Sequence, residues 1–77
     1  MRVAVRGFAK DMLIFEEILD TAQYDLTNLA RDHVQKMTAY PDHMIEVEFI
    51  DEPDNPYRFF RFGTDPSRMA IPLRLKR

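Results

Sequence analysis

The sequence predicts an α+β domain of the order β-α-β-β-β, in which one long amphipathic helix packs on a small, antiparallel-rich sheet. Three observations predict this class. Apolar residues alternate with polar ones near the amino terminus, recur every three or four residues from about 10 to 39, and alternate again from residue 43 onward. A period of two is typical of a half-buried strand and a period near 3.6 of a helix. The length of 77 residues and the 45% hydrophobic content predict one domain over residues 1–77.

The first element is predicted to be a short strand over residues 2–6. Val3 and Val5 fall on one side of it, and Arg2, Ala4 and Arg6 fall on the other. Gly7 follows directly and is expected to end the strand, because glycine weakens strand interiors.

A helix is predicted next, from about Lys10 to Ala39. Pro41 disfavours helical geometry at Tyr40 and so sets its end. Asp20 and Gln23 have the spacing of a capping box, so a bent or split helix stays open, although no glycine or proline interrupts this stretch. The apolar stripe consists of Met12, Phe15, Leu19, Ala22, Leu26, Leu29, Ala30, Val34 and Met37. About 29 helical residues would span roughly 43 Å, whereas a seven-residue strand covers only about 23 Å, so part of the helix is expected to overhang the sheet.

Three strands in a meander complete the predicted order. Residues 43–50 alternate, residues 51–56 are dense in turn formers, and residues 57–63, read as YRFFRFG, form the return strand. A second turn leads to a last strand over residues 69–75. Pro72 has no N–H to donate, which predicts that this strand lies at a sheet edge.

The hairpin register follows from its side chains, because directly opposed residues share a face. Placing Val47 opposite Phe60 and Ile45 opposite Phe62 collects these apolar residues in one core, with Phe49 opposite Arg58. The same register pairs Glu46 with Arg61. It also leaves Met44, Ile50, Tyr57 and Phe59 on the face away from that core.

These leftover apolar side chains predict a partner, since one helix covers only one face of a small sheet. We therefore expect a small non-catalytic protein–protein interaction or regulatory module that self-associates, most simply as a homodimer. Aromatic residues supply much of the burial energy at such surfaces. The predicted partner-binding residues are Met44, Glu46, Ile50, Tyr57, Phe59 and Arg61, with Glu46 and Arg61 as an orienting charge pair. The alternative interpretation is that the helix splits and its second half covers these side chains.

Composition argues against several other classes. The chain has no cysteine, so a disulfide framework, a thiolate zinc site and a cysteine nucleophile are excluded. No signal peptide or membrane span is apparent, which predicts a cytoplasmic protein. His33 falls on the helical stripe and is interpreted as a hydrogen-bonded core histidine, and a metal site joining His43 and Glu46 would require a distorted strand. No catalytic residue, metal or cofactor is therefore predicted.

Nucleic-acid binding is the alternative function. Tyr57, Phe59 and Arg61 could stack bases and hold phosphate, and Arg68, Arg74, Lys76 and Arg77 add a basic segment. Glu46, Glu48 and the net charge of −2 weigh against it.

The segments DNPYRFFRF and RMAIPLRLKR, together with the predicted element order, resemble the carboxyl-terminal half of RelE/ParE-type toxins. This resemblance covers about thirty residues through generic alternation, without a diagnostic motif, and such toxins are typically basic. It implies RNA cleavage, with Arg58, Arg61 and Arg68 as the residues to test.

Overall fold

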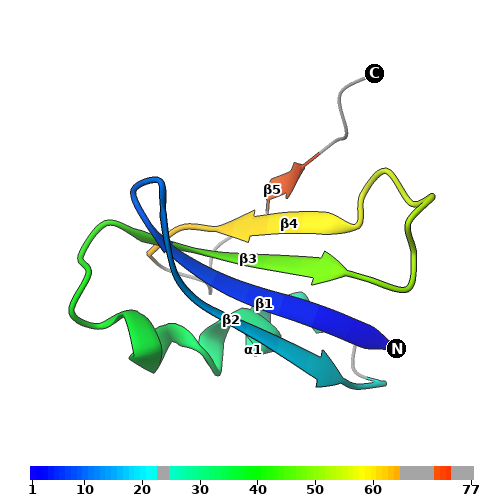
Figure 1. Cartoon of the computed structure of the whole chain (residues 1–77), viewed down its shortest axis with the longest axis horizontal. Helices are drawn as coiled ribbons and strands as arrows, with labels where there is room; N and C mark the ends of the chain where they lie inside the picture. Colours follow the sequence, from blue (N-terminus) through cyan, green and yellow to red (C-terminus); the bar gives the residue numbers. More distant parts are fainter. Residues whose placement is uncertain (23–24, 65–70, 74–77) are drawn as a thin grey trace.

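The computed structural model describes residues 1–22, 25–64 and 71–73, and its main element is a five-stranded antiparallel sheet (Figure 1). The strands are arranged in the order β2-β1-β3-β4-β5. Along the chain the elements are β1 (Arg2–Ala9), β2 (Met12–Asp20), α1 (Leu26–Arg31), the 3₁₀ helix η1 (Val34–Met37), β3 (His43–Phe49), β4 (Phe59–Phe62) and β5 (Ile71–Leu73). The order is thus β-β-α-β-β-β.

The predicted long helix is wrong, and with it the predicted β-α-β-β-β fold class. Residues 12–20 form strand β2, which pairs with β1 through a tight turn at Lys10 and Asp11. A β-bulge shifts the pairing between Gly7 and Phe8, so that Phe15 lies opposite Gly7 while Leu13 lies opposite Phe8. An extra residue in one strand interrupts the period of two. The interrupted pattern imitates the helical period, which explains the wrong prediction.

The helical connection between β2 and β3 is short. The six-residue helix α1 begins after Asp25, whose Oδ1 accepts a hydrogen bond from the Asn28 N–H at 3.1 Å. This is the usual N-cap arrangement. The alternative of a helix that begins at Asp20 is not realised either, because Asp20 is the last residue of β2. The 3₁₀ helix η1 ends at Met37, and the helical region ends before Pro41 as predicted.

The predicted hairpin register is confirmed. Val47 pairs with Phe60, Ile45 with Phe62 and Glu46 with Arg61, and the Phe49 N–H donates to the Arg58 carbonyl at 2.9 Å. Strand β5 lies at the sheet edge, as Pro72 predicts. The other predicted residues of that last strand lie outside the described residues.

The core lies between the sheet and the helical connection. Its buried side chains come from alternate positions of β1 and β3, from β4 and from the helices: Val3, Val5, Leu29, Ala30, Met37, Ile45, Val47, Phe49 and Phe62. Gly7 does not end β1. It lies within the strand, at a position where a side chain has no room. A Cβ at Gly7 would fall 2.2 Å from Phe15 Cε2 and 2.7 Å from Met37 Sδ.

Within the described residues, the helices are too short and too polar to cross a membrane.

Candidate interaction surface

The sheet has one face toward the helical connection and one face away from it, here called the outward face. Strand β3 alternates strictly, with His43, Ile45, Val47 and Phe49 buried and the residues between them half-buried. The half-buried set therefore points to the outward face. In the described part of the chain, no helix or strand packs over that face.

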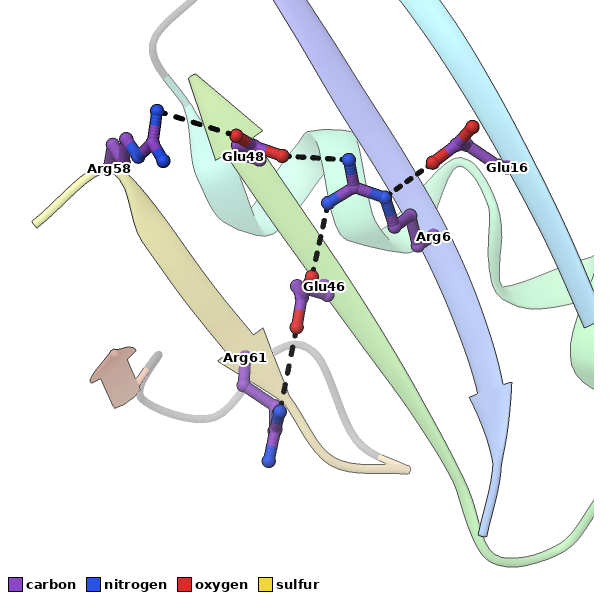
Figure 2. A network of polar contacts seen from close by, with 6 residues as sticks. All are labelled: Arg6, Glu16, Glu46, Glu48, Arg58 and Arg61. Carbon is purple, nitrogen blue, oxygen red and sulfur yellow. Dashed lines mark hydrogen bonds and ion pairs between the residues drawn. The ribbon is translucent and has the colours of Figure 1, made fainter. Parts of the chain in front are cut away.

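Four directly paired residues form a row of alternating charge across the outward face, and we call them the charged row: Glu16 on β2, Arg6 on β1, Glu46 on β3 and Arg61 on β4. Arg6 Nε donates to Glu16 Oε2 at 2.6 Å and Arg6 Nη1 to Glu46 Oε1 at 3.2 Å. Arg61 Nη2 lies 3.5 Å from Glu46 Oε2. Figure 2 shows the four side chains following one another from strand to strand.

Glu48 extends this network along β3. It accepts Arg6 Nη2 at 2.7 Å and lies 3.6 Å from Arg58 Nη1 (Figure 2). The Arg58 guanidinium in turn lies over the Phe59 ring, 4.6 Å from its centroid. The side chains of Glu46 and Glu48 are only 12% and 14% exposed, and each lies within 3.6 Å of two arginines.

Arg6 is the centre of the network. Partial burial opposes its charge, but hydrogen bonds to Glu16, Glu48 and Glu46 outweigh that cost and raise the pKa of Arg6 above the ordinary arginine value. Arg6 is therefore a fixed cation that links β2, β1 and β3. A planar guanidinium suits this position because its donors point in several fixed directions.

Apolar residues flank the charged row on both sides. Toward the β1–β2 turn, Phe8 pairs with Leu13 and with Met44. On the other side, Ala4 pairs with Ile18 and Glu48, and Glu48 pairs with Phe59. Ile18 is 52% exposed and Leu13 is 49% exposed. Exposed apolar side chains gathered on one face are typical of a protein-binding surface.

The sequence-predicted partner-binding residues divide into two groups. Met44, Glu46, Phe59 and Arg61 all lie in strands on the outward face. Ile50 and Tyr57 lie in the connection between β3 and β4, just outside the strands, and Tyr57 is exposed. The predicted Glu46–Arg61 pair is present.

Two members of the charged row, Arg6 and Glu16, were not predicted as site residues. Arg6 could be assigned to the outward face from the alternation of residues 2–6, but its partners depend on β1 lying beside β3. Glu16 falls within the stretch from about Lys10 to Ala39 that the sequence predicts to be helical. Its position opposite Arg6 follows only once the hairpin and its bulge are known.

Both histidines are buried and hydrogen-bonded. His33 Nδ1 lies 2.8 Å from the Leu29 carbonyl and Nε2 lies 3.2 Å from Glu17 Oε2, which agrees with its interpretation as a core histidine. His43 Nδ1 lies 2.6 Å from the Tyr40 carbonyl. His43 points to the buried face and Glu46 to the outward face, so the two do not converge on a metal. The described residues contain no group of three or more side chains placed to hold a metal ion.

Only some of the residues that suggested nucleic-acid binding lie within the described part of the chain. Arg61 and Arg58 both lie within 3.6 Å of a carboxylate, while Arg68, Arg74, Lys76 and Arg77 lie outside the described residues. The element order that resembled RelE/ParE-type toxins is not present, because β2 occupies the place of the predicted helix.

Comparison with known proteins gives no assignment: no family model matches the chain, and neither a curated protein nor a solved structure matches it significantly.

Proposed function

We propose that this protein is a small non-catalytic protein-interaction module, and that it self-associates through the outward face. The observation that carries the proposal is the charged row lying between two apolar strips on a face that no described helix or strand covers. Apolar area supplies the free energy of association, whereas the charges select the partner and its orientation. The cytoplasmic location stays a prediction.

Nucleic-acid binding remains the second candidate from the sequence, and one observation weighs against it. Arg6, Arg58 and Arg61 already have carboxylates at 2.6 to 3.6 Å. A phosphate would have to compete with Glu16, Glu46 and Glu48 for the same guanidinium groups, and the acids would repel it.

Truncation of exposed apolar residues tests the proposal. Ile18→Ala and Met44→Ala remove apolar contacts from the outward face, and each should weaken self-association about tenfold, as measured by sedimentation equilibrium over a concentration series. Met12→Ala is the matched control, because Met12 is 66% exposed but pairs with Ala9, in register with the buried face. Its association constant should stay at the wild-type value.

Two results would contradict the proposal. One is a wild-type protein that remains monomeric up to about 1 mM, the weakest range of specific association. The other is tight binding of single-stranded RNA or DNA that falls steeply with added salt, which is typical of phosphate contacts.

A further inference from the structure

We propose that the outward face binds the outward face of a second copy of this chain, across a two-fold axis that runs parallel to the strands between β1 and β3. This inference rests on the proposed function and specifies its geometry. It follows from the order in which charge and apolar side chains occur across the sheet.

The charge order is self-complementary about that axis. From β2 to β4 the charged row carries negative, positive, negative and positive side chains in turn. Rotation about an axis between β1 and β3 lays β1 over β3 of the second copy and β2 over β4. Arg6 then faces Glu46 of the second copy, and Glu16 faces its Arg61. All four contacts across the axis join opposite charges.

Part of the apolar strips matches under the same rotation. Because the axis runs along the strands, each row falls on its own counterpart. Phe8 on β1 faces Met44 of the second copy, and Ile18 on β2 faces its Phe59. Between the two Ile18–Phe59 contacts, Ala4 faces Glu48 of the second copy. Two stacked sheets lie about 10 Å apart and cross at about 30°, a geometry that long side chains can bridge.

The other two-fold axes fit less well. An axis in the plane of the sheet but across the strands lays each residue of the charged row over itself, so that Arg6 would face Arg6. An axis perpendicular to the sheet joins two copies along β2, the long edge strand. It buries one edge strand and leaves the apolar side chains of the outward face open. Like charges placed opposite one another disfavour the first of these two arrangements.

The dimer should be weak. Four strands at about 4.8 Å spacing and five to seven residues in length give a footprint of roughly 14 by 20 Å, or about 280 Å² per copy. This is below the roughly 600 Å² per partner of weak specific interfaces. We therefore expect a dissociation constant at the upper end of the micromolar range, within the span of a sedimentation equilibrium series from about 1 μM to about 1 mM.

Charge reversal at the two ends of the charged row tests the geometry. Glu16 and Arg61 are its most exposed members, at 44% and 41%, so substitution there disturbs the buried side chains least. Each reversal also places a like charge beside Arg6 or Glu46 in its own chain, so the unfolding free energy of each variant is measured together with its association. Glu16→Arg places two positive charges opposite each other in its homodimer, and Arg61→Glu places two negative charges. Each variant alone should dimerise at least about tenfold more weakly than the wild type. In an equimolar mixture, position 16 of one chain again faces the opposite charge at position 61 of the other, so a heterodimer should form at near wild-type affinity.

Asp32→Arg and Arg31→Glu provide matched charge reversals at the end of α1, on the other side of the sheet. They should leave the dissociation constant unchanged, alone and mixed. Circular dichroism and thermal unfolding confirm that each variant is folded.

The outcomes separate the two proposals. Rescue in the mixture supports the facing arrangement. A wild-type dimer whose affinity neither reversal changes, or whose loss the mixture does not rescue, overturns this arrangement while the proposed self-association stands. A wild type that is monomeric up to about 1 mM overturns both.

Discussion

Gly7 lies directly opposite Phe15 in the pairing of β1 with β2, and the Phe15 ring occupies the space that a Gly7 side chain would need. The Phe15 ring also stacks on His33, with 5.8 Å between ring centroids. The contact therefore ties the first hairpin to the helical connection. It explains why a glycine lies within strand β1.

Gly7→Ala should therefore destabilise the protein. A Cβ 2.2 Å from Phe15 Cε2 forces the ring and Met37 to shift, and overpacking of this kind typically costs about 1–3 kcal/mol. Chemical denaturation with urea measures the loss. Gly63→Ala is the matched control, because no atom lies within 4 Å of its added Cβ. Equal effects of the two substitutions would contradict the packing role of Gly7.

Lys10→Gly should stabilise the protein. Lys10 is the only described non-glycine residue with a positive φ, at 55°, and it lies in the two-residue turn between β1 and β2. Glycine adopts this backbone conformation without the Cβ penalty, which is about 1 kcal/mol. The urea midpoint should rise accordingly, whereas Asp11→Gly at the neighbouring turn position should not raise it. A lower midpoint for Lys10→Gly would show that the turn does not carry this strain.

Replacing Arg6 should cost stability even without a partner. Arg6→Leu leaves Glu46 and Glu48 half-buried with only the longer contacts to Arg61 and Arg58, at 3.5 and 3.6 Å. Removing one partner from charged hydrogen bonds costs about 1–3 kcal/mol. Arg6→Lys keeps the positive charge, but a lysine ammonium cannot reach three carboxylates at once. The unfolding free energy of Arg6→Lys should therefore fall between that of the wild type and that of Arg6→Leu. A variant as stable as the wild type would show that the network contributes nothing to folding.

Stability should decline in acid because of two exposed carboxylates. Hydrogen bonds from Lys36, opposed by desolvation, lower the pKa of Glu17 below the ordinary value of 4.5, and hydrogen bonds from Arg2 lower the pKa of Asp51 below 3.8. Both groups release their protons more readily in the folded state. Their stabilisation is therefore complete above the ordinary values and is lost as the pH falls through the lower folded-state pKa values.

Urea titrations from about pH 7 to about pH 2 should follow this decline. Glu17→Gln and Asp51→Asn should each lower stability at neutral pH and flatten the acid dependence, whereas Asp54→Asn in the exposed loop should change neither. An unchanged slope in both variants would show that these ion pairs do not differ between folded and unfolded states.

The sequence predicts the carboxyl-terminal half of the described chain better than the first half. Strand β3 alternates without interruption, and its apolar residues match those of β4 only in one register, so the pairing of Val47 with Phe60 can be derived. Met44, Glu46, Phe59 and Arg61 follow from that register and lie where they were predicted. These inferences need only the period of two and one charge pair.

The first half misleads for identifiable reasons. The turn at Lys10 and Asp11 lacks the glycine that usually marks a hairpin, and the bulge opposite Gly7 and Phe8 places consecutive apolar residues in β2. Together they produce the spacing of a helix. The position of Glu16 beside Arg6, and hence the complete charged row, depends on these long-range pairings and could not be read from local sequence.

The outermost position of β2 also has a consequence for the behaviour of the protein at high concentration. Strand β2 is a nine-residue edge strand, and long edge strands can pair with further chains and so lead to fibrils. The acidic side chains of β2 repel the same side chains of another copy, and the bulge in its pairing with β1 bends the strand away from a straight edge. In the proposed dimer, the two-fold axis buries the same surface of both copies, so no such surface is left for a third copy. The protein should therefore form discrete dimers and not polymers.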